Sequence, residues 1–384
     1  MLRRAALSLV VLSTLSSFCL AGPWSQMVVF GDSLSDTGST LAYTSTLNTQ
    51  TFGLVARRPV GPRYATGRWT NGNGVNYATL DLANGTSSLV WHERLADQLG
   101  AARAISVNAA GTPANRNNFA CGAALSTGGQ VTQSVPFVGN LPLIDNMGHQ
   151  VNTLFGAGTA TMRSDTLYSF WGGANDIRDA VNSGTVTTTQ QAAAVGAAAS
   201  SNIRSYISAL ATRAQQQNVR ISVAWPNVVP LQFVPDFADA YGGTAARRSL
   251  VEAGSLGFRT AWQADIAALQ SAFPTSLTVY PVDVYTWLSQ FVQGAGLPQG
   301  TNVTDPILDF GAFSGLGFNP TRNSTARVPS GANPDTFVFW DRLHPTAWMH
   351  ERIGDYMATV IPAPATVFAL ACGTLLATRR RRVG

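Results

Sequence analysis

One serine stands where a strand would present it to a binding crevice. The run at residues 28–30 is apolar and largely β-branched, which predicts a short buried strand, and Gly31, Asp32 and Ser33 follow it as a turn. Ligands of open parallel sheets bind beyond the carboxyl ends of the strands, so we predict that Ser33 faces such a crevice. The alternative is that Asp32, Ser33 and Ser35 only cap the next helix.

An aspartate and a histidine stand three residues apart near the other end of the chain, at Asp341 and His344. In a turn, this spacing lets the carboxylate hold one imidazole nitrogen and aim the other outward. A serine hydroxyl is a weak nucleophile that needs a base within hydrogen-bond distance, and the base needs an orienting group. Ser33, His344 and Asp341 supply these three groups, although Asp341 could instead cap a turn before Pro345.

Acyl transfer also needs hydrogen-bond donors for the oxyanion that forms on the attacked carbonyl. Asn175 follows the apolar run 167–171 and a glycine turn, and so repeats the arrangement at Ser33. Gly122 has no Cβ and lets the backbone approach a ligand, although an ordinary turn would also use a glycine. We predict that the N–H groups of Ser33 and Gly122 and the side-chain amide of Asn175 form the oxyanion hole.

Four short segments resemble the signature blocks of the GDSL, or SGNH, family of serine esterases and lipases. In chain order they are Gly31-Asp32-Ser33-Leu34, Asn118-Phe119-Ala120-Cys121-Gly122-Ala123, Gly173-Ala174-Asn175-Asp176 and Asp341-Arg342-Leu343-His344-Pro345. The resemblance implies a flavodoxin-like, three-layer α/β/α sandwich around a central parallel sheet. It also implies the roles given above: nucleophile and partners at Ser33, Asp341 and His344, oxyanion hole at Gly122 and Asn175. Ala123 departs from the pattern, since many relatives carry a second glycine there.

The alternation of strands and helices along the chain predicts parallel βαβ units with helices on both faces of one sheet. Besides 28–30, strands are expected at 104–107, 167–171, 219–224 and 277–282, and helices at 90–99, 188–217, 245–273 and 347–360. Residues 37–88 are polar and glycine-rich, which predicts a long loop without long helices that covers the site. Further loops are expected at 128–148 and from 292 to 333.

Several other residues suggest a chemical role but also have a plainer explanation. Aromatic side chains of the 37–88 segment are candidates for contact with acyl chains or sugar rings, or for simple packing; they are Tyr43, Phe52, Tyr64 and Trp69. His92 lies on an amphipathic helix and is expected to be structural or exposed, and His149 has no visible partner. Cys121 is expected to be a small buried side chain.

Charge and residue types argue against several classes of function. Six of the 25 basic residues lie in the terminal segments, and the remaining 19 nearly balance the 20 acidic residues, so nothing indicates a nucleic-acid partner. All 25 are arginine, which leaves no lysine for a Schiff base or a phosphate-binding loop. The chain has no Gly-x-Ser-x-Gly or His-Glu-x-x-His run, so we expect no metal and no cofactor.

Both ends of the chain are typical of removable segments. Residues 1–21 combine two arginines, an apolar run and small residues before an expected cut after Ala21, as in a secretory signal peptide. Residues 362–384 combine Pro-Ala-Pro, a short apolar stretch and four arginines, and resemble a PEP-CTERM signal, a bacterial tail removed on export by a membrane transpeptidase-like enzyme. We therefore expect one hydrolase domain over 22–361, with signal peptidase and a sorting transpeptidase as partners and only transient membrane contact.

These features predict an exported serine hydrolase of the periplasm, cell surface or extracellular matrix that cleaves carboxylic esters through an acyl-enzyme on Ser33. The substrate is expected to be a small-molecule or polymeric ester. The residues leave open whether it is a lipid or acyl ester or an acetyl ester of a polysaccharide. The alternative from another class is a non-catalytic glycan- or matrix-binding surface protein on the same fold, which the long polar loops and the tail suggest.

Overall fold

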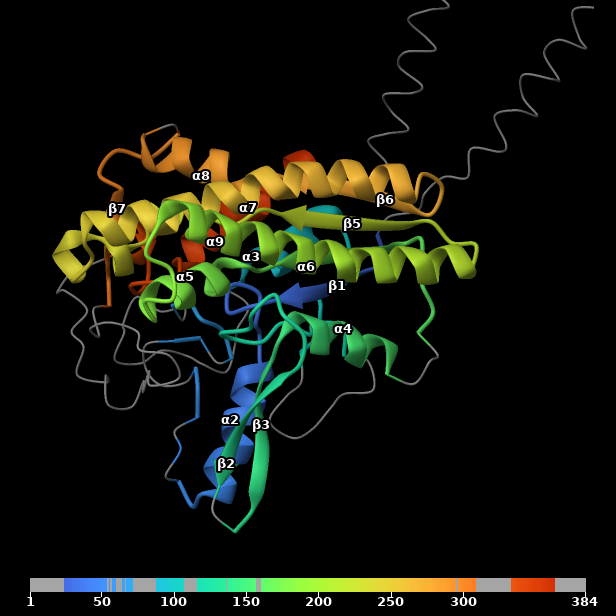
Figure 1. Cartoon of the computed structure of the whole chain (residues 1–384), viewed down its shortest axis with the longest axis horizontal. Helices are drawn as coiled ribbons and strands as arrows, with labels where there is room; N and C mark the ends of the chain where they lie inside the picture. Colours follow the sequence, from blue (N-terminus) through green and yellow to red (C-terminus); the bar gives the residue numbers. More distant parts are fainter. Residues whose placement is uncertain are drawn as a thin grey trace, which may run out of the picture.

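Four parallel strands form the centre of the fold. The computed structural model describes residues 24–362 except 54, 56, 60–63, 66, 72–87, 107–115, 136, 157–159, 295 and 309–332. The strands are β1 (Gln26–Gly31), β4 (Thr166–Trp171), β5 (Ile221–Pro226) and β6 (Leu277–Val282), and their spatial order is β1-β4-β5-β6. Strands β4 and β5 are buried along their whole length because helices cover both faces of the sheet (Figure 1). The predicted three-layer α/β/α sandwich is therefore confirmed.

The prediction of a strand at 104–107 is wrong for the part of it that the structure describes, residues 104–106. The carbonyl of Ile105 accepts the N–H groups of Asn117 and Asn118, and its own N–H donates to the side chain of Asn117. Those bonds close a local loop and leave only single bridges from Ala102 and Asn118 to the free edge of β1. The segment thus lies beside the sheet without joining it.

Two groups of helices make the outer layers. On one side α6 (Thr189–Gln216) contacts α4 (Met147–Phe155), α5 (Ala174–Asn182) and α7 (Ala245–Ala272). On the other side α3 (Trp91–Leu99) packs against α9 (Ala347–Val360), which also reaches β6. The helices predicted at 90–99, 188–217, 245–273 and 347–360 are all confirmed within a residue or two at each end.

Helices α6 and α7 pack backbone to backbone because glycines stand at their crossing. A Cβ at Gly196 would lie 2.0 Å from the carbonyl oxygen of Gly254, and one at Gly257 would lie 2.3 Å from that of Ala193. Only glycine permits such an approach. The two longest helices of the described chain therefore form one rigid layer behind the sheet.

An arm projects from the body at the bottom of Figure 1. It consists of α2 (Ser39–Gln50) with the turn after it, and of the antiparallel hairpin β2 (Gln130–Val135) and β3 (Gly139–Asp145). Helix and hairpin share a small apolar core; it contains Leu47, Cys121, Ala124, Val135, Leu143 and Ile144. We call residues 39–53 and 130–145 the arm.

The arm corrects two predictions, because 37–88 contains a twelve-residue helix and 128–148 contains a hairpin. Helix α2 begins because the carboxylate of Asp36 accepts the N–H groups of Gly38, Ser39 and Thr40, which the helix would otherwise leave unpaired. Burial of Leu47 against the hairpin then offsets the low helix propensity of its many serines and threonines. The cap is a local contact, whereas the burial of Leu47 is a tertiary one.

The last third of the chain closes the sheet and adds a small strand pair. Helix α8 (Val284–Val292) follows β6, and β7 (Asn302–Pro306) pairs in parallel with β8 (Phe337–Phe339). Strand β7 lies inside the 292–333 segment that was predicted to be loop, and the Tyr241 hydroxyl fixes it by donating to Asp305 at 2.8 Å. The short 3-10 helices are Leu231–Phe233, Pro235–Phe237, Asp239–Tyr241 and Pro334–Thr336.

The two terminal segments, 1–21 and all but the first residue of 362–384, lie outside the described residues. The signal peptide and the sorting tail therefore stay predictions. Within the part that is described, no helix combines the length and apolar character needed to cross a membrane.

Candidate active site

Ser33 lies in a tight turn immediately after β1. A Cβ at Gly31 would lie 2.4 Å from the carbonyl oxygen of Trp171, so glycine is required where β1 ends beside β4. The turn is closed by Asp32, whose carbonyl accepts the N–H groups of Ser35 and Asp36 and whose carboxylate accepts that of Leu34. The serine is thus presented at the carboxyl end of the sheet, as the sequence predicts.

Asp341 and His344 lie in one turn and face Ser33. The Oδ1 atom of Asp341 accepts the backbone N–H groups of Leu343 and His344, both at 2.7 Å. Its Oδ2 atom lies 2.8 Å from Nδ1 of His344, and Nε2 of the same ring lies 2.9 Å from the Oγ atom of Ser33. The three side chains form one hydrogen-bonded line in which the imidazole can accept the serine proton.

Two aromatic residues from the 37–88 segment hold this line in place. The Tyr64 hydroxyl donates to Oδ2 of Asp341 at 2.6 Å, and both side chains are fully buried. Burial, and then the charge of Asp341, raise the pKa of Tyr64 well above its usual value, so the hydroxyl stays a donor. The Trp69 ring stacks on His344 with the ring centres 5.2 Å apart. Both aromatics therefore pack on the site, one of the two roles considered for them from the sequence.

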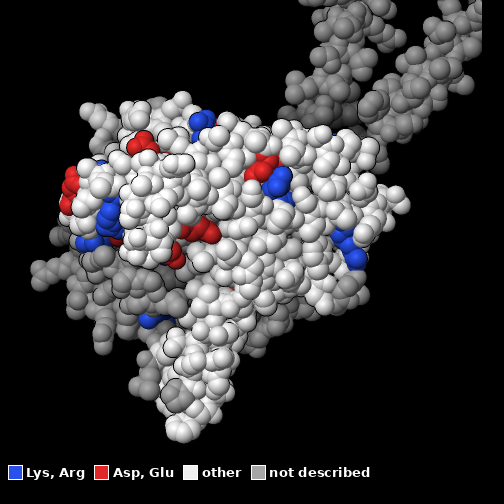
Figure 2. Space-filling model, viewed as in Figure 1, with Lys and Arg blue, Asp and Glu red and all other residues white. Residues whose placement is uncertain are grey.

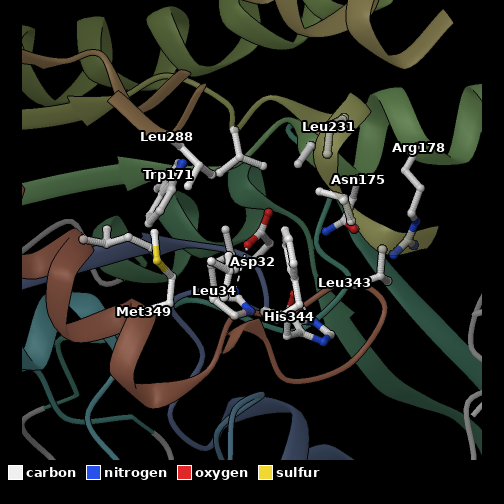
Figure 3. Close-up of a pocket in the computed structure, with 18 residues that line it drawn as sticks. Asp32, Leu34, Trp171, Asn175, Arg178, Leu231, Leu288, Leu343, His344 and Met349 are labelled. Carbon is white, nitrogen blue, oxygen red and sulfur yellow. Dashed lines mark hydrogen bonds between the residues drawn. The ribbon is translucent and has the colours of Figure 1, made fainter. Parts of the chain in front are cut away.

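Two of the three residues predicted to form an oxyanion hole, Ser33 and Asn175, line the pocket beside His344. Asn175 lies in the first turn of α5 and lines the same pocket as Ser33 and His344 (Figure 3). Its Nδ2 atom donates one hydrogen to the carbonyl of Ala124 at 3.1 Å, which orients the amide and leaves the second hydrogen available. The N–H of Ser33 has no acceptor among the described residues.

The geometry at Gly122 differs from the prediction. Its N–H donates to the carboxylate of Asp36 at 2.9 Å and to the hydroxyl of Thr40 at 2.7 Å, and Gly122 does not line the pocket. A Cβ there would lie 2.7 Å from the indole nitrogen of Trp69, so glycine is needed for packing. The N–H is not available to an oxyanion while these bonds stand, because a buried carboxylate is a strong acceptor.

The neighbouring Ala123 has a φ of 63°, in the left-handed region that glycine adopts without strain. This is the position where the resemblance leads one to expect a second glycine. The backbone here thus adopts a conformation that a glycine would take without strain, although the residue is alanine.

An apolar pocket opens from Ser33 between the end of the sheet and helices α8 and α9. The space between its walls is about 700 Å³ when the open solvent at its mouth is included. Asn175 and His344 lie toward one end, and Trp171, Leu288 and Met349 toward the other (Figure 3). Most of the wall is hydrocarbon; its apolar side chains are Leu34, Trp171, Ala174, Val229, Leu231, Val234, Leu288, Val338, Phe339, Leu343, Pro345, Met349 and Ile353.

Two charged side chains also border the pocket. Asp32 is buried in its floor, and burial raises the pKa of its carboxyl to about 6. Arg178 lies at the end near Leu343 (Figure 3), where its guanidinium is paired with Asp179 at 2.8 Å. The pocket therefore offers an apolar interior with little fixed charge.

Two further histidines, His92 and His350, and the cysteine of the described chain are buried and structural. His92 is fully buried with Nε2 3.0 Å from the carbonyl of Ser35, and burial lowers its pKa to about 4. His350 is also buried, accepts the N–H of Trp91 at 3.4 Å and has its pKa lowered to about 3 by burial. Cys121 is buried as predicted, which raises the pKa of its thiol well above the usual value. No three metal-binding side chains gather anywhere among the residues that the structure describes.

Comparison with known families finds one matching family model. The model of the family described as GDSL-like Lipase/Acylhydrolase matches residues 27–357. The match spans most of the chain, so the protein belongs to this family of acyl hydrolases. No match is found among curated proteins.

Proposed function

We propose that the protein hydrolyses carboxylic esters through an acyl-enzyme on Ser33. The observation that carries the proposal is the hydrogen-bonded line from Asp341 through His344 to the Ser33 hydroxyl, which ends at an apolar pocket. As Oγ attacks the ester carbonyl, Nε2 of His344 takes its proton, and Asp341 stabilises the imidazolium that results.

The tetrahedral oxyanion is stabilised by the N–H of Ser33 and the free amide hydrogen of Asn175. When the intermediate collapses, the bond between the carbonyl carbon and the alcohol oxygen breaks, and His344 returns its proton to the leaving alkoxide. Water then enters, loses a proton to His344 and attacks the acyl group on Ser33. A second collapse releases the carboxylic acid and restores the serine.

The pocket favours an apolar acyl chain over an acetyl group. An acetyl ester would leave most of the hydrocarbon wall in contact with water, whereas a longer chain would bury it. Each buried methylene contributes about 0.8 kcal/mol, which corresponds to about a fourfold gain in kcat/KM until the pocket is filled. This supports a lipid or other long-acyl ester rather than an acetylated polysaccharide.

A chain-length series tests this choice. We would measure kcat/KM for p-nitrophenyl esters from acetate to palmitate and expect values that rise with chain length to an optimum. Leu288→Phe, at the far end of the pocket, should move that optimum to shorter chains, while Leu256→Phe on the exposed face of α7 should not. A maximum at acetate that Leu288→Phe does not change would contradict the acyl pocket and favour a deacetylase.

We also propose that the protein is exported and acts in the periplasm, at the cell surface or in the matrix. The supporting feature is the pair of terminal segments, 1–21 and 362–384. Intact mass spectrometry of the protein from cytoplasmic and exported fractions should find an exported form that begins after Ala21. A full-length chain confined to the cytoplasm would contradict export.

A further inference from the structure

The tip of the arm carries the most exposed large apolar side chains of the described protein. Phe137, in the turn of the β2–β3 hairpin, is fully exposed, and Phe52, just after α2, is 97% exposed. Val138 beside Phe137 is 43% exposed. Scattered apolar side chains on a surface are normal, but two phenylalanines without any cover at the end of a projection are not.

Both phenylalanines are held in an unfavourable backbone conformation. Phe52 has a φ of 50° and Phe137 a φ of 65°, and this left-handed region is uncommon for bulky residues. A backbone hydrogen bond spans each phenylalanine and closes its turn. The N–H of Gly53 donates to the carbonyl of Asn48, and the N–H of Val138 donates to the carbonyl of Val135. Backbone strain of this kind persists only where the surrounding structure enforces the conformation, and it is concentrated at functional sites.

The arm carries no charged side chain except the buried Asp145 at its base. Residues 37–56 and 117–144 contain no Asp, Glu, Lys or Arg. In the space-filling view the arm is the white projection, while the charged side chains of this face lie on the body (Figure 2). Insertion of the tip into an apolar medium would therefore bury no charged group.

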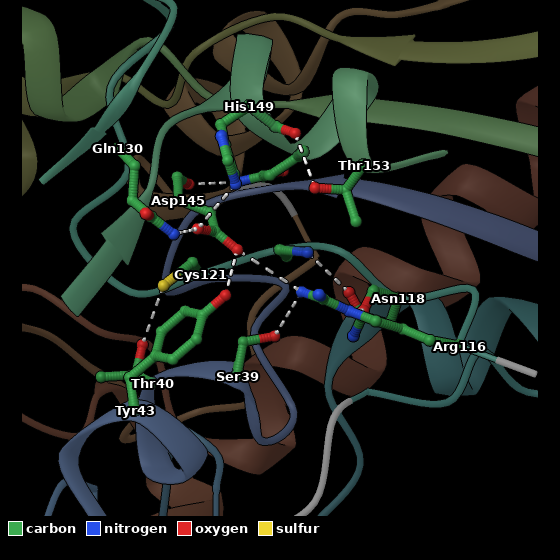
Figure 4. A network of polar contacts seen from close by, with 12 residues as sticks. Ser39, Thr40, Tyr43, Arg116, Asn118, Cys121, Gln130, Asp145, His149 and Thr153 are labelled. Atoms are coloured by element: carbon green, nitrogen blue, oxygen red, sulfur yellow. Dashed lines mark hydrogen bonds and ion pairs between the residues drawn. The ribbon is translucent and has the colours of Figure 1, made fainter. Parts of the chain in front are cut away.

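The base of the arm is tied to the body by a buried carboxylate. Asp145 accepts hydrogen bonds from the Tyr43 hydroxyl on α2 and from the amide of Gln130 on β2, the latter at 2.6 Å (Figure 4). Arg116 and His149 from the body lie 3.8 Å and 3.6 Å from its oxygens. His149 thus has a partner that the sequence did not reveal. These contacts join helix, hairpin and body, so the tip is presented at a fixed place.

We propose that the arm is a peripheral anchor that inserts Phe52, Phe137 and Val138 into an uncharged or zwitterionic lipid surface. Amphipathic or aromatic tips of this size bind at the boundary of headgroups and acyl chains. A protein partner fits less well, because a stable protein interface buries about 800 Å² on each side, far more than three side chains. This inference goes beyond ester hydrolysis and does not require that Ser33 reacts.

A fluorescent label at the tip tests the anchor directly. We would place a cysteine by Val138→Cys in the full chain, with Cys19→Ser and Cys372→Ser so that only the buried Cys121 remains besides it. An environment-sensitive dye on this cysteine should shift to the blue when phosphatidylcholine vesicles are added, and lipids with a quencher in the upper acyl chain should quench it. The dye reports its own surroundings, so binding through another part of the chain leaves it unchanged.

Two sets of variants complete the design. The same dye on Leu256→Cys, exposed on α7, should not respond to vesicles. Phe52→Ser and Phe137→Ser should each weaken the lipid response at position 138 about tenfold, and the pair about a hundredfold, because each removes one buried aromatic side chain. Hydrolysis of a soluble p-nitrophenyl ester should be unchanged in the two single variants and in the double variant, which would show that the body is intact.

Four results would overturn the anchor. The first two are a dye at position 138 that does not respond to vesicles, and dyes at 138 and 256 that respond equally. The third is a response of the dye at 138 only to anionic phosphatidylglycerol vesicles. The fourth is a response without lipid that grows with protein concentration and is lost when Phe52→Ser and Phe137→Ser are combined. The last would assign the tip to a second copy of the chain. Repeating the titration with Ser33→Ala separates this test from the proposed hydrolysis, because lipid insertion should survive in that variant.

Discussion

The substitution Asp341→Asn tests whether Asp341 determines which ring nitrogen of His344 carries the hydrogen. In the native site Oδ1 of Asp341 accepts two backbone N–H groups at 2.7 Å. An asparagine must keep its oxygen at this position, since an NH₂ group there would face two donors with no acceptor between them. The NH₂ group then takes the place of Oδ2 and points at Nδ1 of His344, 2.8 Å away.

This orientation forces the wrong tautomer on the imidazole. To accept from the new NH₂ group, Nδ1 of His344 must be unprotonated, so Nε2 carries the hydrogen and can no longer take the proton of Ser33. In a triad of this kind the loss is about 10⁴ in kcat, or about 5.5 kcal/mol of transition-state stabilisation. The shape of the side chain is kept, and the Tyr64 hydroxyl can rotate to accept from the amide, so the fold should survive.

The assay is kcat on the best p-nitrophenyl ester at pH 7 to 9, with circular dichroism and thermal unfolding as controls. We expect kcat to fall by about 10³ to 10⁴ with KM within a few-fold of native. Asp341→Glu should lose activity too, by misplacing the carboxylate. A folded Asp341→Asn protein that keeps more than a tenth of the native kcat would show that Asp341 does not set the tautomer of His344, and the reasoning would be refuted.

Three further predictions follow from the same geometry. Asn175→Ala should lower kcat about 10²- to 10³-fold with little change in KM, because it removes one oxyanion donor; a large rise in KM alone would assign Asn175 to substrate binding. Burial raises the pKa of Asp32 to about 6, so its charge opposes folding as pH rises from about 4 to 6 and costs up to about 3 kcal/mol above that range. Asp32→Asn should therefore raise the free energy of unfolding at pH 8 but not at pH 4, in urea titrations at both values. Burial lowers the pKa of His350 to about 3, so stability should be lost as pH falls below about 6.5, and His350→Gln should weaken that loss in titrations at pH 7 and 4.

The sequence was informative where chemistry and local structure coincide. Ser33 could be placed because an apolar strand and a glycine turn precede it directly, and Asp341 could be paired with His344 because three residues of a turn separate them. The long helices α6, α7 and α9 and the inner strands were predictable for the same reason, since their patterns are local and strong.

Contacts between distant segments could not be predicted in this way. The bond from Tyr64 to Asp341 joins residues 277 positions apart, and nothing near either residue announces it. Helix α2 was missed because its threonine-rich sequence has a low helix propensity and its burial comes from the distant hairpin, although its cap, Asp36, stands only three residues before Ser39. The engagement of the Gly122 N–H by Asp36 and Thr40 is likewise a tertiary contact, which the motif around Gly122 could not reveal.

The most direct test of the account is the reaction of the purified protein with an alkyl fluorophosphonate, because only an activated serine reacts with this probe. After digestion, mass spectrometry should find one adduct per chain, on the peptide that contains Ser33. Ser33→Ala should give none, and Asp341→Asn should react far more slowly. A folded native protein that forms no adduct, or one whose labelling persists in Ser33→Ala, would contradict the assignment of Ser33 as nucleophile and favour a binding protein built on a hydrolase fold.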